Sequence, residues 1–521
     1  MLLHNLAEHR RQIWTGLVIL MLSGCALPPL ADRPDSRSIP QSQTRETVLG
    51  QAITPKTEAH PGQSGVVLLP DPYDAFAARA LLAEAAEASL DVQYYIWRPD
   101  TTGSLMLYTL YRAAERGVRV RLLLDDNGIA GMDDILAALS QHPNIEIRLF
   151  NPFVVRNPKW LGYFTDFRRL NYRMHNKSFT ADNQATIIGG RNIADEYFGA
   201  AQGAMFADLD VLAIGPAVDE VSRDFDRYWA SSYARTARQI LGEPGPEPLA
   251  ALAESFRTTE NSDAASVYAR TLEDSAFLRS LLARELAFSW APVVMVSDDP
   301  AKVLGGNNRE DLLSRQLARA LDDPERSITL VSPYFIPRDA GVELFRKLEE
   351  RGVEVRVLTN SLEANDVAMV HAGYSKYRKP LLRAGVELWE MRRLDDEPPR
   401  ERDLQSGMMG SSASSLHAKT FAVDGETLFV GSFNFDPRSI HLNTELGFVI
   451  ESPELARVLE REFDQQVRFT AYRVVLNEDG ELRWLEQQEH RTVTYSHEPG
   501  TGPLKRMLVF FWSLMPIESL L

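Results

Sequence analysis

His175-Asn176-Lys177-Ser178-Phe179-Thr180-Ala181-Asp182 is followed by Gly189-Gly190-Arg191-Asn192, and this whole pattern occurs twice in the chain. The second copy is His417-Ala418-Lys419-Thr420-Phe421-Ala422-Val423-Asp424, followed at the same offset by Gly431-Ser432-Phe433-Asn434. A carboxylate lies downstream of each copy, at Asp208 and at Glu445. One His-x-Lys-x4-Asp match arises easily by chance, but two matches with the same downstream spacing indicate a duplicated unit.

The repeat extends upstream of these motifs. Residues 90–98 correspond to 330–338, residues 115–123 to 350–358, and residues 145–149 to 386–390. The middle pair predicts a helix that ends at a glycine and leads into a β-branched strand. Strands that alternate with helices are typical of α/β units on a largely parallel sheet. The sequence therefore predicts an α/β fold class, with two duplicated α/β/α domains, mostly parallel sheets and one shared active site at the domain interface.

Length and composition divide the rest of the chain. Its 521 residues exceed one ordinary core. We expect the first domain at 65–240 and the second at 306–490, with residues 241–305, which have no counterpart, as a helical connection. Residues 26–64 are rich in Pro, Ser, Thr and Gln, which is typical of a flexible tether. Residues 491–521 form a C-terminal tail.

The motif residues suit phosphate chemistry. Alternation along a strand puts each histidine and the lysine two residues later on one face. The lysines, Lys177 and Lys419, supply charge for a phosphate oxygen, and the amides of Asn192 and Asn434 donate further hydrogen bonds. The glycine-containing turns let the backbone approach the phosphate closely.

Two histidines can address both sides of a phosphodiester. One of His175 and His417 acts as nucleophile and the other as general acid. Asp208 and Glu445 each hold an imidazole tautomer, so each half is a four-part unit of His-Lys, glycine turn, Asn and carboxylate. The motif carboxylates Asp182 and Asp424 complete the catalytic pattern, but they fall at the end of the strand, where we expect a structural role.

Charge and cysteine content narrow the function classes. The formal net charge of −16 disfavours nucleic acid as a partner, because phosphate neutralisation supplies most of that affinity. The chain has one cysteine, and its histidines lack metal-ligand spacing, so we predict neither a metal nor another cofactor.

That cysteine, Cys25, ends a segment with the marks of a secretory signal. Residues 4–11 carry histidine and arginine, residues 13–22 are apolar, and Leu22-Ser23-Gly24-Cys25 follows. The ending resembles the lipobox of bacterial lipoproteins. That resemblance implies removal of the segment before Cys25 (domain boundary 1–25), lipidation of Cys25 and, from Ala26, the periplasmic side of the outer membrane. The alternative is an uncleaved inner-membrane anchor, although the apolar run is short for a span.

The paired motifs resemble the HKD motifs of the phospholipase D superfamily over nearly all of residues 66–490. Within it the chain is most similar to bacterial cardiolipin synthases. Three stretches carry this closer likeness: Tyr94-Tyr95-Ile96-Trp97, Leu123-Leu124-Asp125-Asp126-Asn127-Gly128 and Ser332-Pro333-Tyr334-Phe335-Ile336-Pro337. Typical members have two N-terminal transmembrane helices, which this sequence lacks.

The resemblance implies a two-step transfer without metal. His175 attacks phosphorus to give a phosphatidyl-histidine, and His417 protonates the departing alcohol and deprotonates the incoming one. With phosphatidylglycerol as acceptor the product is cardiolipin, and phosphatidylethanolamine is a further candidate substrate. The alternatives are hydrolysis by a phospholipase D or other phosphodiesterase, a nuclease, and a lipoprotein that binds lipid without turnover.

Three further segments bear on contact with a membrane. Residues 156–173 interleave basic and aromatic side chains, which suits an anionic lipid interface, although a loop packed on its own domain shows the same pattern. Residues 505–515 are basic and then apolar, which predicts an interfacial helix or, alternatively, a strap across the core. Residues 407–415 are serine-rich and favour either a mobile gate or a plain linker.

Overall fold

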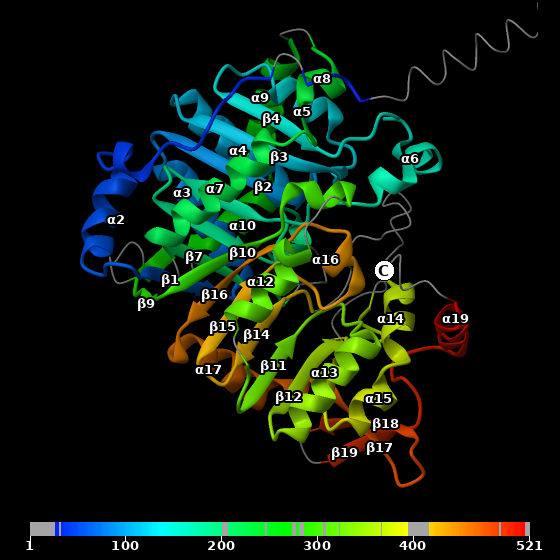
Figure 1. Cartoon of the computed structure of the whole chain (residues 1–521). Helices are drawn as coiled ribbons and strands as arrows, with labels where there is room; N and C mark the ends of the chain where they lie inside the picture. Colours follow the sequence, from blue (N-terminus) through cyan, green and yellow to red (C-terminus); the bar gives the residue numbers. More distant parts are fainter. Residues whose placement is uncertain are drawn as a thin grey trace, which may run out of the picture.

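The computed structural model describes residues 27–30, 33–200, 207–244, 247–273, 278–280, 286–305, 309–321, 323–365, 367–393, 416–488 and 491–515. These residues form two halves, each built on one large sheet (Figure 1). The first sheet has the order β8-β4-β3-β2-β5-β6-β7-β1-β9, and the second has the order β10-β16-β15-β14-β11-β12-β13-β17-β18-β19. The α/β class and the duplication are therefore confirmed.

The elements of the first half run from residue 48 to residue 291. Its strands are β1 (Ser64–Leu69), β2 (Ser89–Ile96), β3 (Arg119–Gly128), β4 (Ile145–Phe150), β5 (Ser178–Ala181), β6 (Ala185–Gly189), β7 (Asp210–Ile214), β8 (Ala234–Thr236) and β9 (Ser289–Ala291). Its helices are α2 (Val48–Glu58), α3 (Pro72–Ala85), α4 (Thr101–Glu115), α5 (Asp133–Leu139), α6 (Gly162–Leu170), α7 (Pro216–Ala230), α8 (Ala237–Leu241), α9 (Glu247–Glu260) and α10 (Asp263–Glu273).

The second half runs from residue 293 to the end of the described chain. Its strands are β10 (Val293–Ser297), β11 (Ser327–Val331), β12 (Glu354–Asn360), β13 (Glu387–Met391), β14 (Thr420–Val423), β15 (Thr427–Gly431), β16 (Leu446–Glu451), β17 (Ala471–Leu476), β18 (Leu482–Gln488) and β19 (Arg491–Tyr495). Its helices are α12 (Leu313–Ala320), α13 (Arg338–Glu350), α14 (Ala368–Ser375), α15 (Arg378–Arg383), α16 (Pro437–His441), α17 (Pro453–Glu462), α18 (Arg468–Thr470) and α19 (Pro503–Ser513).

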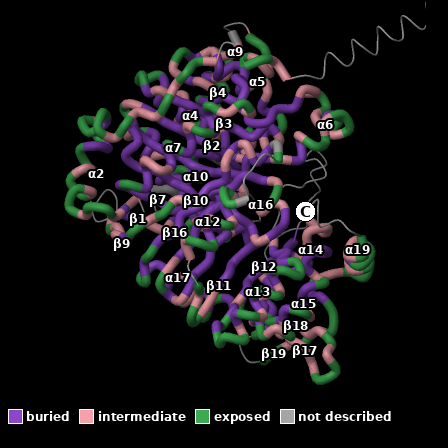
Figure 2. Tube along the Cα trace, viewed as in Figure 1, coloured by how far each residue is buried: buried purple, intermediate pink, exposed green. Residues whose placement is uncertain are grey.

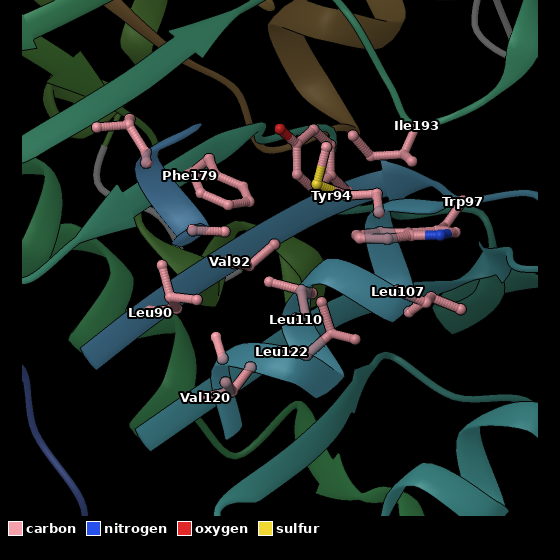
Figure 3. Close-up of a cluster of buried hydrophobic side chains, with 14 of the residues drawn as sticks. Leu90, Val92, Tyr94, Trp97, Leu107, Leu110, Val120, Leu122, Phe179 and Ile193 are labelled. Carbon is pink, nitrogen blue, oxygen red and sulfur yellow. The ribbon is translucent and has the colours of Figure 1, made fainter. Parts of the chain in front are cut away.

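Strand β2 shows how the sequence builds the core of the first half. Leu90, Val92 and Tyr94 alternate along one face and pack against β3 and α4 (Figure 3). The intervening Asp91 is also buried and pairs with Arg121 of β3, with 2.6 Å between Oδ1 and Nε. Both faces of the sheet are therefore covered, the first by α3 and α4 and the second by α7.

Parallel pairing is more limited than expected. It joins β2 to β3 to β4 in the first half and β11 to β12 to β13 in the second. The other neighbouring strands pair antiparallel. The reason is local: helical crossovers connect the parallel strands, whereas β5 and β6 are joined by a tight turn in which Asp182 and Asn183 have positive φ.

The two sheets meet along β6 and β7 on one side and β14 to β16 on the other. One buried cluster takes side chains from both, among them Ile188 and Val211 of the first half and Val430 and Phe448 of the second. The halves therefore share a core as well as a boundary.

The expected tether is wrong for the described residues before 64. Thr47 caps α2 through its side chain, and Leu49 and Ile53 are buried against the first half. Further upstream, the Arg33 guanidinium donates to the Ser231 carbonyl at 2.6 Å, and Arg121 donates to the Ser36 carbonyl at 2.9 Å. Arginine donors thus fix a segment whose composition suggested disorder.

Two other segment boundaries differ from the expectation. The connection at 241–305 contains the helices α9 and α10, but it also adds β9 to the first sheet and β10 to the second. The second sheet continues to Tyr495 in β19, past the expected boundary at 490. Among the described residues, no helix has the length and apolar composition that a membrane span requires.

Candidate active site

His175 lies at the boundary between the halves. Its backbone N–H donates to the Thr444 carbonyl at 2.8 Å, and Met174 forms an isolated parallel bridge with Thr444. Its ring Nδ1 is 2.8 Å from Oε2 of Glu445 and 3.2 Å from the Ser432 carbonyl. The imidazole is therefore oriented by groups from the second half.

His417 is held in the mirrored way. Its backbone N–H donates to the Ala207 carbonyl at 2.9 Å, and Leu416 bridges Ala207. Its Nδ1 is 2.6 Å from Oδ2 of Asp208. Both imidazoles are buried, and each uses Nδ1 to bind a carboxylate, which leaves Nε2 for chemistry.

The two carboxylates are exchanged between the halves relative to the four-part units of the sequence. Glu445 follows the second motif but binds the histidine of the first, and Asp208 follows the first motif but binds the histidine of the second. The carboxylate function that the sequence predicts is present, but neither half supplies it to its own histidine.

The two lysines lie beside the histidines. The Lys177 ammonium donates to the His175 carbonyl at 2.7 Å and sits 5.7 Å from the centre of the Tyr95 ring. The Lys419 ammonium binds the His417 carbonyl and is 3.3 Å from Nε2 of the same residue. Each lysine is therefore buried against the backbone of its own motif histidine, and Lys419 also reaches the His417 ring, at 2.9 Å from Nδ1.

The two asparagines are also buried in the site. Asn192 accepts from the Ile96 N–H at 3.1 Å and donates to the Tyr197 hydroxyl at 2.9 Å, so one amide hydrogen remains for a ligand. The side-chain oxygen of Asn434 is buried without a hydrogen-bond partner among the described residues. Flipping that amide presents its N–H₂ group instead, which suits a phosphate oxygen.

The carboxylates of Asp182 and Asp424 bind backbone N–H groups, which is the structural role that their position at the end of a strand predicted. The Asp182 carboxylate accepts from the backbone N–H groups of residues 87, 88 and 89 at 2.8 to 3.2 Å. The Asp424 carboxylate does the same for residues 325, 326 and 327 at 2.7 to 3.0 Å. Both carboxylates therefore hold a backbone segment in place, so their grouping with the catalytic residues is corrected.

The motif glycines make room for protein groups. A Cβ added to Gly190 would lie 2.0 Å from Oδ1 of Asp208, and one added to Gly431 would lie 2.4 Å from the Leu446 carbonyl. The expectation was close approach of the backbone to phosphate. The structure shows close approach to the segments that carry Asp208 and Glu445.

Burial sets the charge state of the site. It lowers the pKa of His417 to about 3, helped by Lys419, and lowers the pKa of His175 well below its ordinary value, helped by both lysines. Burial also lowers the pKa of Lys177 to about 7 and of Lys419 to about 8. Both imidazoles are thus neutral at neutral pH.

The carboxylates differ from each other. Burial raises the pKa of Glu445 to about 7, against the pull of Lys177. Burial also acts to raise the pKa of Asp208, but the adjacent His417 and Lys419 outweigh it and hold that pKa well below its usual range. The two halves therefore offer similar geometry with different electrostatics.

The sequence did not identify three residues that contact the histidines and Glu445. The rings of Tyr95 and Tyr197 contact His175 and His417 edge-on, at 5.0 and 5.1 Å between centroids. Ser432 donates to Oε2 of Glu445 at 2.5 Å. Tyr95 lies in a stretch that carried the family likeness and Ser432 lies within the repeat, but no spacing rule marks Tyr197.

Two predicted features fall on parts of the chain that the structure does not describe. Cys25 and residues 407–415 lie outside the described residues. Within the described ranges, no group of three or more His, Cys, Asp or Glu side chains is arranged to hold a metal ion.

Comparisons with known proteins agree with this arrangement. The family described as cardiolipin synthase, PLD-like domain, matches residues 80–229 and 317–467. The chain is 47% identical over 473 residues to cardiolipin synthase C of Escherichia coli (strain K12), covering 91% of this chain and 99% of that protein. It is 27% identical over 413 residues to cardiolipin synthase A of Pseudomonas entomophila (strain L48), covering 78% and 70%.

A solved structure supports the fold independently. The phosphatidylserine synthase of Haemophilus influenzae Rd KW20 superimposes with a TM-score of 0.55 at 14% identity, over 90% of this chain and 99% of that one. At this identity the likeness concerns the fold alone.

Proposed function

This chain belongs to the cardiolipin synthase family and is a phosphatidyltransferase of the phospholipase D superfamily, and from that premise we propose that it forms cardiolipin through a phosphatidyl-histidine. The observation that carries the proposal is the pair of crossed contacts, His175 with Glu445 and His417 with Asp208. They aim two neutral imidazoles, flanked by two lysines, at one phosphodiester.

In the first step His175 is the nucleophile. Its Nδ1–H donates to Glu445, and its Nε2 lone pair attacks phosphorus. Burial and the lysine charges lower its pKa, so the imidazole is unprotonated and available. The P–N bond forms as the bond from phosphorus to the head-group oxygen breaks.

The leaving alkoxide takes a proton from Nε2 of His417. Burial first and Lys419 second lower the pKa of His417 to about 3, which is too low for an acid at neutral pH. An incoming phosphodiester brings a negative charge between the lysines, which offsets their effect on the imidazole. Substrate binding therefore favours protonation of His417, which supplies the proton that the first step uses.

In the second step the roles of His417 reverse. The head-group hydroxyl of phosphatidylglycerol gives its proton to Nε2 of His417 and attacks phosphorus, and the P–N bond breaks. The products are cardiolipin and free His175. Phosphatidylglycerol or phosphatidylethanolamine serves as the phosphatidyl donor, with glycerol or ethanolamine as the released alcohol.

Assays with purified full-length protein test the identity of the donor and acceptor lipids. We expect cardiolipin from phosphatidylglycerol vesicles, with glycerol or, when phosphatidylethanolamine is added, ethanolamine released in equal amount. Phosphatidic acid as the main product would make the protein a hydrolase. Cleavage of DNA in place of lipid would contradict the proposal altogether.

The nucleophile is tested by trapping. A radiolabelled phosphatidyl donor, rapid denaturation and peptide mapping should place the label on the peptide that contains His175. Label on the His417 peptide would reverse the two assignments. His175→Ala should abolish labelling, and His417→Ala, which lacks the acid of the first step and the base of the second, should slow both the formation and the turnover of the label.

We further propose that Cys25 is lipidated and holds the protein on the periplasmic side of the outer membrane. Packing of the chain begins close to this residue, because the Pro28 carbonyl already accepts from Nε of Arg235 at 3.0 Å. An anchor at Cys25 would therefore keep the body close to the bilayer. Labelling with a radioactive fatty acid should be lost in Cys25→Ala, and unchanged labelling would exclude this anchor.

A further inference from the structure

Helix α19 carries its apolar side chains on the outside. Leu504, Met507, Leu508, Phe511 and Leu514 follow helical spacing on one face, and Leu504 and Phe511 are 73% and 58% exposed. The opposite face contacts the protein body through Val509 and Trp512. We call these exposed apolar side chains the α19 face. Their arrangement is the reverse of that in an ordinary surface helix, whose apolar side chains face the protein body.

The charged residues of α19 are turned the other way. The Lys505 ammonium donates to the Leu362 carbonyl at 2.6 Å, and Arg506 binds the Thr501 carbonyl. Their side chains are half-buried against the body, while the apolar stripe points outward. The helix is therefore fixed with its apolar face presented to the surroundings.

A second exposed apolar group lies around α6, in the other half. It consists of Trp160, Leu161, Phe164 and Phe167, which we call the α6 face, and Phe164 is 81% exposed. In the shared view of Figures 1 and 2, α6 and α19 both lie on the right-hand side of the molecule, with α6 above α19. Figure 2 shows much of both helices as exposed.

Three of the basic residues around α6 are paired with carboxylates, and Arg168 is exposed. Arg156 pairs with Asp126 and Asp133, and the Lys159 ammonium is 3.0 Å from Asp126. Arg169 pairs with Asp166 at 2.5 Å. The charges of Arg156, Lys159 and Arg169 are therefore neutralised by carboxylates, which weakens the electrostatic attraction to anionic lipid that the sequence suggested, and the exposed side chains of the α6 face are apolar.

Helix α6 is connected to the reactive histidine. The Tyr163 hydroxyl donates to Oδ1 of Asn127 at 3.0 Å, and the Asn127 amide donates to the Tyr95 hydroxyl at 3.4 Å. The Tyr95 ring in turn contacts His175. The surface at α6 thus leads by direct contacts to the site where a lipid phosphate would react.

We propose that the α6 face and the α19 face together dock the protein on a lipid bilayer. A helix with an exposed apolar face can lie in the interface of a bilayer, and a bilayer can contact two separate apolar helices from different halves at once. The proposal rests on the proposed function, because bilayer lipid as substrate is what makes a bilayer the occupant. Docking is driven by apolar burial, so it depends little on lipid charge or salt.

The test is sedimentation of the full chain, carrying Cys25→Ala so that no acyl anchor contributes, with vesicles of phosphatidylcholine alone, which lacks the substrate, at low and high salt. We expect binding at both salt concentrations, and about tenfold weaker binding for each of Phe164→Gln and Phe511→Gln. Phe469→Gln and Leu344→Gln, exposed apolar residues on other helices, are the matched controls and should bind as the parent does. The melting temperature of each variant checks that it folds.

Three results would overturn the proposal. Binding that Phe164→Gln and Phe511→Gln leave unchanged would remove both faces from the contact. Binding that requires anionic lipid and disappears in high salt would assign docking to a basic surface. A dimer of the parent protein that Phe511→Gln dissociates, with no loss of vesicle binding, would assign the α19 face to a second copy of this chain. A failure to make cardiolipin would change none of these binding measurements, so failure of the proposed function can be distinguished from failure of the docking proposal.

Discussion

His417 Nδ1 lies 2.6 Å from Oδ2 of Asp208, although the two residues are 209 positions apart and belong to different halves. His175 and Glu445 repeat the relationship in the opposite direction. Each half therefore contributes a reactive histidine and the carboxylate that orients its partner's histidine. Neither half holds a complete His–carboxylate pair, which explains why the duplicated halves share a buried core at β6, β7 and β14 to β16.

The crossed pairs predict that both carboxylates are needed for turnover. Asp208→Asn and Glu445→Gln keep the shape of the side chain but remove the charge that stabilises the correct tautomer and the imidazolium. We expect each to lower kcat by about 10²–10⁴-fold with little change in secondary structure. The measurement is the initial rate of phosphatidyl transfer.

A glutamate outside the site provides the control. Glu451 is exposed at the end of β16, six residues after Glu445, and Glu451→Gln should retain the parent rate. If only one of the two site variants loses activity, the carboxylates do not act in equivalent pairs.

Gly190 predicts a second effect on the same pair. A methyl group there would lie 2.0 Å from Oδ1 of Asp208, so Gly190→Ala must displace the carboxylate that orients His417. Displacement by about an ångström should lower kcat by about 10²-fold. Gly502→Ala is the matched control, because a Cβ at Gly502 meets no atom within 4 Å. Equal rates for the two variants would show that the Asp208 segment can move without cost.

The motif aspartates predict a loss of stability, with activity retained in the folded protein. Asp182 is fully buried and accepts three backbone N–H groups, so Asp182→Ala should lower the free energy of unfolding by about 2–4 kcal/mol. Asp424 makes the same contacts in a more exposed place, and its replacement should cost about 1–2 kcal/mol. Urea unfolding gives both values. A stable Asp182→Ala protein without turnover would return this residue to the catalytic group.

Particular residues show how far the sequence reaches. The duplicated motifs predict the α/β halves and the two His–Lys pairs, because two matches at equal spacing indicate one repeated unit. The strand that was expected to hold each pair begins only after the lysine, at Ser178 in β5 and at Thr420 in β14, so alternation along a strand does not place these side chains. Spacing cannot say which histidine Asp208 serves, since the pairing depends on how the two sheets pack. Composition also misleads at residues 33–58, where Arg33 and Arg121 bind carbonyl groups and order a segment rich in Pro and Ser. The antiparallel β5–β6 turn depends on positive φ at Asp182 and Asn183, which the alternation of helices and strands does not reveal.

The charge states predict a narrow pH optimum for kcat/KM. Burial raises the pKa of Glu445 to about 7, so this carboxyl gains a proton as the pH falls below that value and His175 loses its anionic partner. Burial lowers the pKa of Lys177 to about 7 and of Lys419 to about 8, so the charges that bind phosphate are lost as the pH rises. Because Glu445 and Lys177 interact, the two limbs belong to the coupled site, and we expect a bell centred at about pH 7. Glu445→Gln should remove the acid limb at a lower overall rate and keep the alkaline one. A flat profile from about pH 5.5 to 9, or an acid limb that persists in Glu445→Gln, would contradict this assignment.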